Sequence, residues 1–288
     1  NTPSNTSLTV RYLTGGGVGS NILANTLTNV NTSNIQFLKG GLNTTTAQYV
    51  FDSIASNNPY AANGGNNGDT VEDIRQNAIS QFSTQMRNVT QDDYLVRALS
   101  MPSKYGTISK AFTQKPNADE ANTTLDIYCL SQNEQSQLTI PSPTLKNNLK
   151  TYINEYRMIG DTISIKNAFI INFAIDFEIV TYPNYINNKV LSDCIVALRN
   201  YFRIDKWQIN QPIITPDLFV LLDAVDGVQT VKQINFTNKT GTSQNYSEWA
   251  YDMNAANQNG TIFPSLDPSI FELKFPNSDI KGRVVNLF

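Results

Sequence analysis

The chain contains no histidine among its 288 residues. This absence excludes the Ser-His-Asp and Cys-His nucleophile systems, zinc sites built on imidazole, and histidine as a general base. The commonest hydrolytic mechanisms are therefore closed to this protein, and we expect it not to be an enzyme.

Charged side chains are scarce, at 16% of the chain, and the formal net charge is -3 with an isoelectric point near 5.0. A protein that binds nucleic acid needs a basic field to neutralise phosphates. We therefore expect no nucleic-acid partner. Asn, Thr, Ser and Gln supply most of the polar surface, which suits permanent protein contacts better than the steering of charged ligands.

Cysteine and long apolar runs are also rare. The two cysteines, Cys129 and Cys194, lie far apart in apolar segments, which predicts buried free thiols and neither a disulfide scaffold nor a zinc site. No apolar run approaches the roughly 20 residues of a membrane span. We expect no membrane, metal or cofactor. Because the chain starts without Met and opens into a strand-like stretch, we expect it to be the C-terminal part of a longer polypeptide.

Three patterns that superficially suggest chemistry have simpler explanations. The glycine-rich segment 15–20 lacks the Lys-Ser/Thr ending of a phosphate loop, which favours a turn. Adjacent acids such as Asp92 and Asp93 fall in predicted first helical turns, where they complement the helix dipole. Asp176 and Glu178 share the polar face of one strand, and a solvated face explains them better than a cation site.

The first half of the chain predicts a strand-rich domain, residues 1–140, with an inserted helix pair. Thr70 with Asp73, and Thr90 with Asp93, are each spaced as a capping box that begins a helix. Alternating segments near 108–112 and 124–130 predict strands. Residues 8–13 predict another strand, ahead of the glycine-rich turn.

The second half, residues 141–288, predicts an α+β domain. Ser142 and Pro143 begin a helix, and two further helices are expected at about 188–202 and after 215. Residues 169–181 alternate apolar and polar, which predicts a strand with one covered face and one wetter face. The fold class is thus α+β, with helices packed on small, mainly antiparallel sheets in two mixed domains.

A long Asn- and Gly-rich segment at about 237–268 retains aromatic residues, notably Trp249, Tyr251 and Phe263. Loops of this length are uncommon inside compact domains. Two interpretations stay open: the segment packs on its own domain, or it is an arm that contacts a neighbouring subunit. The alternating residues 271–275 predict a terminal strand, which would add to a sheet edge of this chain or of a partner.

One stretch resembles a known family. The run from Gly68 to Ala78, continued by Gln85 to Tyr94, resembles the baseplate J family and the related wedge subunit of T-even-type contractile phage tails. In that family an acidic capped helix is followed by a "Gln-x-Arg-x-Val-Thr-x-x-Asp-Tyr" turn into the next helix. Weaker similarity extends over most of residues 8–236. In the signature, Thr90 is expected to cap the second helix, Arg87 to pair with Asp93 or a nearby carboxylate, and Tyr94 to anchor the joint between the helices.

The resemblance implies a structural role without chemistry. Its expected partners are the chain itself, as a dimer or ring, and other baseplate wedge proteins. The expected location is the tail baseplate of a virion, assembled in the cytoplasm of a bacterial host. Two other functions stay open. The aromatic residues Tyr246, Trp249 and Tyr251 are typical of a carbohydrate- or receptor-binding module, and a glycosidase would need two carboxylates across a cleft.

Overall fold

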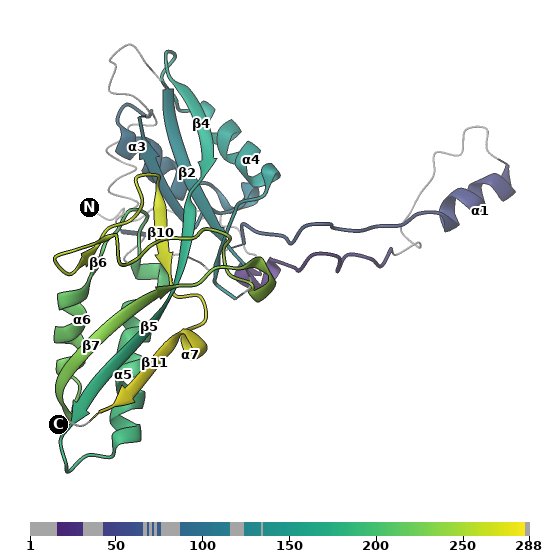
Figure 1. Ribbon diagram of the computed structural model, residues 1–288. Coiled ribbons are helices and arrows are strands. Elements are labelled where there is room, and N and C mark those ends of the chain that lie inside the picture. The colour runs from purple at the N-terminus through teal and green to yellow at the C-terminus, as the bar shows by residue number, and fades with distance from the viewer. Residues whose placement is uncertain are drawn as a thin grey trace, which may run out of the picture.

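The computed structural model describes residues 16–30, 43–65, 68, 71, 74, 75, 87–115, 124–133 and 135–285. These residues form a body of two lobes and an arm that projects far from the body and carries helix α1, Thr44–Asp52 (Figure 1). Within the described residues, no helix is long and apolar enough to cross a membrane. The predicted strand at 8–13 and the capping box of Thr70 and Asp73 lie outside the described residues.

The upper lobe is built on a four-stranded sheet. β1 (Lys110–Gln114) and β3 (Leu138–Thr139) pair antiparallel with β2 (Thr124–Gln132), and β4 (Thr162–Asn167) pairs parallel with it. Helices α3 (Gln91–Leu99) and α4 (Pro143–Asn154) pack on this sheet and on each other. Their buried residues include Tyr94, Leu149 and Ile153, which share one core with Ile127 and Cys129.

The predicted start signals of both helices are present. Thr90 Oγ1 accepts the Asp93 amide N–H while the Asp93 carboxylate accepts the Thr90 N–H, which completes a capping box. Ser142 accepts the Leu145 N–H, and Pro143 occupies the first turn of α4. These local bonds satisfy amide groups that would otherwise have no partner at a helix N-terminus.

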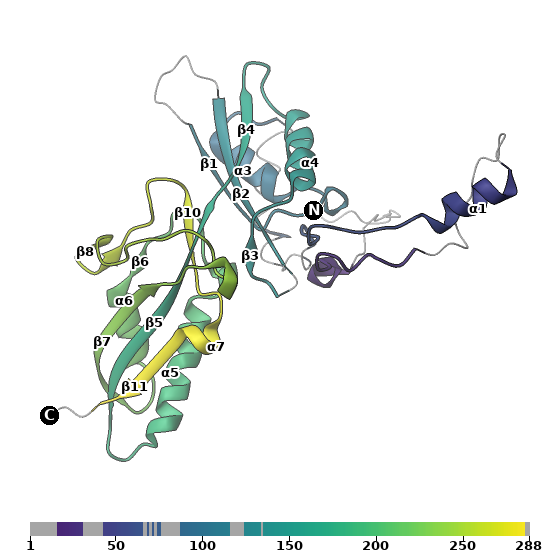
Figure 2. The same ribbon diagram turned by 45° about the vertical axis from the view of Figure 1, so that its right-hand side comes forward.

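The lower lobe is organised around the long strand β5 (Phe169–Thr181). β7 (Val228–Asn238) pairs antiparallel with β5, whereas β10 (Ser269–Glu272) and β11 (Ile280–Val284) pair parallel with it. Helices α5 (Asn187–Tyr201) and α6 (Thr215–Asp223) cover one face of this sheet, and the short helix α7 (Pro276–Asp279) precedes β11 (Figures 1 and 2). A small sheet of β6 (Ile213–Ile214), β8 (Asn257–Gln258) and β9 (Thr261–Ile262) flanks α6.

The α+β class is confirmed, because helices pack on mixed sheets in which antiparallel pairs predominate. Both cysteines are buried and free, as expected. The two hydrophobic cores divide near residue 168, between β4 and β5, whereas the sequence placed the domain boundary at 140. The difference arises because α4 and β4 pack with the strands of the first half.

The face of β5 that was expected to be wetter is mostly covered. Among the β5 residues from Ile170 to Val180, Asp176 alone is exposed, and Asn172 and Glu178 are buried. β5 has neighbours along both edges, and the segment after β7 folds over its polar face, where the Ser247 N–H donates to Asn172 Oδ1. Asn172 and Glu178 on that face hydrogen-bond within the protein, and Asp176 between them remains exposed.

Candidate assembly surfaces

The sequence signature forms a corner between α3 and the end of α4. The Tyr94 hydroxyl donates to Asp161 Oδ2 at 2.5 Å and accepts the Met158 N–H at 3.3 Å, so the ring anchors the turn that follows α4. Burial and the bond to Asp161 raise the pKa of Tyr94 to about 12. Tyr94 therefore connects α3 to the segment ahead of β4, whereas its predicted place at the joint with the preceding helix lies outside the described residues.

Arg87 does not pair with Asp93, the first of the two kinds of partner expected for it. It is exposed, and no ion pair joins it to Asp93 within the described residues. Burial alone would raise the pKa of Asp93, but the Thr90 and Val89 amides and the charge of Arg97 outweigh burial and lower it. The carboxylate of Asp93 is satisfied by the cap, and the pairing of Arg87 with another nearby carboxylate stays a prediction.

The residue that the sequence did not single out is Arg97, which is almost fully buried. Its guanidinium carbon lies 4.1 Å from the centre of the Tyr156 ring, a cation–π arrangement. In the sequence, Arg97 lies one turn after Asp93, near the end of its helix. A basic residue at that place ordinarily does no more than complement the helix dipole. Only the approach of α4 places an aromatic ring over it.

The segment 237–268 is not a free arm. Met253 and Ile262 are buried in the lower core, and β9 within the segment pairs with β6. The Tyr251 hydroxyl donates to the Phe263 carbonyl, and Trp249 meets the Phe169 ring edge to face at 4.7 Å. Residues of this segment therefore pack on the lower lobe of their own chain.

The three aromatic residues that suggested a carbohydrate-binding module are in contact with other residues of their own chain. Trp249 and Tyr251 are engaged with their own chain, and the Tyr246 hydroxyl donates to Asp279 while its ring meets Phe275. Trp249 and Phe263 remain 41% and 45% exposed, so a contact of their outer surfaces with a neighbouring subunit stays a prediction.

The true projection is formed by residues 21–30 and 53–63, which run side by side away from the body, with α1 beyond them (Figures 1 and 2). We call these residues and α1 the arm. The two segments are joined by bonds such as Asn25 N–H to the Asn58 carbonyl and Ala62 N–H to the Ile22 carbonyl. The Asn58 side chain also accepts the Thr26 and Leu27 amides.

The base of the arm is fixed to the upper lobe. The Asn21 amide donates to the Gly65 and Gln132 carbonyls and its oxygen accepts the Gly65 N–H. A Cβ on Gly65 would lie 2.5 Å from the Gly17 carbonyl oxygen, and Gly64 has φ of +101° next to it. Only glycine fits this crossing, so the arm leaves the body from a defined point.

The arm displays large apolar side chains to solvent. Tyr49 and Tyr60 are 76% and 78% exposed, Leu23 and Leu27 are more than half exposed, and no residue of α1 is buried. Between residues 16 and 65 the sequence has only two charged residues, Lys39 and Asp52. This scarcity of charge is the signal that could have revealed the arm from the sequence.

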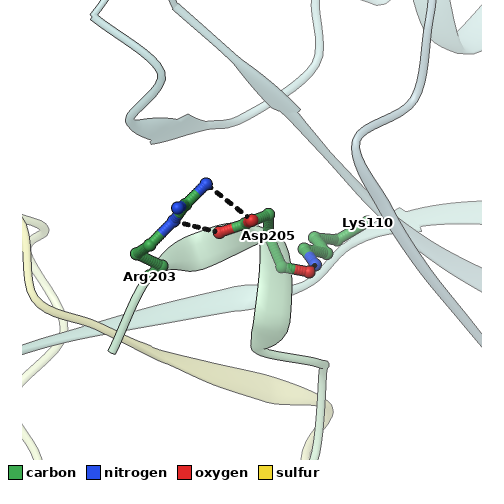
Figure 3. A network of polar contacts seen from close by, with 3 residues as sticks. All are labelled: Lys110, Arg203 and Asp205. Atoms are coloured by element: carbon green, nitrogen blue, oxygen red, sulfur yellow. Dashed lines mark hydrogen bonds and ion pairs between the residues drawn. The ribbon is translucent and has the colours of Figure 1, made fainter. Parts of the chain in front are cut away.

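The two lobes are held together by buried polar contacts as well as apolar ones. Lys110 of β1, 6% exposed, donates from Nζ to the Asp205 carbonyl of the lower lobe at 3.3 Å (Figure 3). The Asp205 carboxylate is paired within the lower lobe, where Arg203 donates two exposed bonds to it. Burial lowers the pKa of Lys110 to about 8, although the negative charge of Asp205 acts in the other direction and raises it.

A second polar junction lies at Glu272 of β10, whose carboxylate accepts the Leu138 N–H and the Asn172 amide. Burial raises the pKa of Glu272. Because Leu130 and Leu138 of the upper strands also reach the lower core, the lobes form one continuous body that can support the arm.

A shallow groove of about 260 Å³ lies over β5, β7 and β11 on the sheet face opposite α5. Its acid Glu178 accepts from Arg283 Nε at 2.7 Å and from the Gln233 amide at 2.9 Å. Within the described residues, no group of three potential metal ligands occurs. The groove therefore presents an internally paired polar surface.

No family model and no curated protein matches the chain. Among solved structures, one chain of a cryo-EM structure of the anti-feeding prophage (AFP) baseplate, 6-fold symmetrised, is similar at 12% identity with a TM-score of 0.46. The similarity covers 76% of this chain and 45% of that chain, so this protein spans less than half of its length. A likeness at this level does not establish a shared fold.

Proposed function

We propose that the protein is a structural subunit of a contractile phage tail baseplate wedge, which associates with itself and with other wedge proteins in the inner baseplate ring. The observation that carries an assembly role is the arm, a projection that displays Leu23, Leu27, Tyr49 and Tyr60 to solvent on a firmly fixed base. Exposed apolar surface of this kind is typical of protein interaction sites.

The baseplate assignment itself is supported by the resemblance of residues 68–94 to the baseplate J family. Its most specific part, from Arg87 to Tyr94, forms the capped corner that joins α3 to the turn after α4. The contacts of Thr90, Asp93 and Tyr94 are all structural, as a non-catalytic subunit requires. The proposal assigns no catalytic residue, cofactor or metal.

The role is tested on whole particles. An antibody raised against this chain is applied to contractile particles made by the host that encodes it, and bound antibody is located by electron microscopy. We expect label at the baseplate end of the tail. Label on the sheath or capsid, or none on disrupted particles in which the baseplate is exposed, would contradict the assignment.

A further inference from the structure

We propose that the outer face of residues 240–268 is the docking site for a different protein of the particle, whose contact surface places Lys or Arg side chains around an apolar one. The inference rests on the proposed structural role and names the chemistry of a partner. The face consists of three exposed apolar side chains and three exposed acids, namely Trp249, Phe263, Leu266, Glu248, Asp252 and Asp267. We call these six residues the docking face.

The apolar side chains of the docking face belong to adjoining parts of the lower lobe. The Trp249 ring meets the Phe169 ring edge to face at 4.7 Å. The Phe169 N–H donates to the Pro268 carbonyl, two residues after Leu266, and Leu266 is fully exposed. The loop that leads into β10 lies at the end of the lower lobe nearest the upper lobe (Figures 1 and 2). A partner at this end would cover Leu266 and Trp249 together.

Internal contacts hold the docking face in a fixed shape. The Tyr251 hydroxyl donates to the Phe263 carbonyl at 2.6 Å. Ser265 Oγ donates to the Asp267 carbonyl, also at 2.6 Å, and Met253 fixes the segment in the lower core. A surface that is already ordered loses little conformational entropy when a partner binds. Tryptophan is also among the residues that contribute most to the stability of protein interfaces.

The charge of the docking face indicates what kind of partner it fits. Residues 240–268 contain three acids and no Lys or Arg. Within the described residues, no ion pair engages any of these acids. Lys166 lies near enough to Asp267 for the two charges to interact, but its ammonium is bound by Asp126 at 2.7 Å. A partner that brings Lys or Arg to this face would therefore meet negative charge that the chain itself leaves uncompensated.

The same charge argues against a second copy of this chain as the occupant. In a twofold contact a patch meets itself, so the three acids of one copy would face the three acids of the other. Like charges that face each other across an interface weaken binding. A different protein with a basic rim and an apolar centre satisfies both the acids and the exposed apolar side chains.

The experiment is photo-crosslinking in assembled particles. The photoreactive residue p-benzoylphenylalanine replaces Leu266 in the whole protein, in the host that makes the particles. Because Leu266 is fully exposed, this replacement leaves the lower core intact. Purified particles are irradiated, and the cross-linked peptide is sequenced by mass spectrometry. We expect a cross-link to a different protein, in a segment that contains Lys or Arg.

A matched control separates this contact from crowding in the particle. The same photoreactive residue is placed at Ile186, which is 73% exposed on the lower lobe, in the connection between β5 and α5. The control should give no cross-link to the peptide that is captured from position 266.

Charge reversal tests the acidic part of the docking face. Glu248→Lys combined with Asp267→Lys should lower the yield of the cross-link from position 266 at least about tenfold per incorporated copy, because the new side chains repel the basic partner. The control is Asp193→Lys, which reverses an exposed acid on α5 and should leave the yield unchanged.

The outcomes that contradict the inference differ in what they say of the proposed function. A cross-link to another copy of this chain, or no cross-link in particles that contain the chain, would overturn the inference. A yield that is indifferent to charge reversal would do so as well. In all three cases antibody labelling of the baseplate would still uphold the structural role, whereas particles that lack the chain altogether would overturn both proposals.

Discussion

Removing one oxygen atom from the corner between α3 and α4 tests whether Tyr94 anchors it. Tyr94→Phe keeps the buried ring but deletes a hydroxyl that donates to Asp161 at 2.5 Å and accepts the Met158 N–H at 3.3 Å. Hydrogen bonds to charged groups contribute about 1.5 to 3 kcal/mol. Because Asp161 is partly exposed and water can replace part of the lost bond, we expect a loss of about 1.5 to 2 kcal/mol.

The probe must report on the upper lobe, because both tryptophans, Trp207 and Trp249, belong to the lower one. Hydrogen–deuterium exchange of the β2 and α4 amides, followed in increasing urea, measures the free energy of opening of the upper core. The control is Tyr60→Phe, whose ring is 78% exposed on the arm and which should change stability by less than about 0.5 kcal/mol. If Tyr94→Phe is indistinguishable from Tyr60→Phe, the anchoring role is refuted.

Other changes test the caps, the division of the cores and the junction between the lobes. Thr90→Ala should cost about 1 kcal/mol in the same exchange assay, because the Asp93 amide loses its acceptor; no loss would mean that the cap is inert. Leu149→Ala should cost about 2 to 5 kcal/mol in the upper core, and Phe173→Ala about 3 to 5 kcal/mol in the lower core. Only Phe173→Ala should strongly shift the urea midpoint of tryptophan fluorescence, because both tryptophans lie in the lower lobe. Equal shifts in the two variants would refute separate cores. Lys110→Met should be neutral or stabilising at pH 7, because it removes a buried charge. The pKa of Lys110 is about 8 in the folded protein and 10.5 in the unfolded chain, so the unfolded chain holds the proton over this range. The free energy of unfolding of the wild type should therefore rise relative to that of Lys110→Met from about pH 8 to 10.5. Parallel profiles of stability against pH for the two proteins would contradict this.

Local signals in the sequence determined much of the fold. The cap pairs Thr90–Asp93 and Ser142–Leu145 involve residues three apart, so their geometry depends on the chain itself and not on distant packing. The bounds of β5 followed from its alternation, and the burial of Cys129 and Cys194 from their apolar surroundings. The α+β class follows from these elements together.

Tertiary contacts decided the rest, since they join residues that are distant in the sequence. Only the return of the chain to β5 places Asn172 against Glu272, one hundred residues later, and buries both side chains. Only the approach of α4 buries Arg97 under Tyr156. The aromatic segment 237–268 packs on its own lobe, whereas the arm, in its described residues, projects into solvent. Composition shows that a segment must pack, and the three-dimensional fold determines whether its own chain supplies the surface.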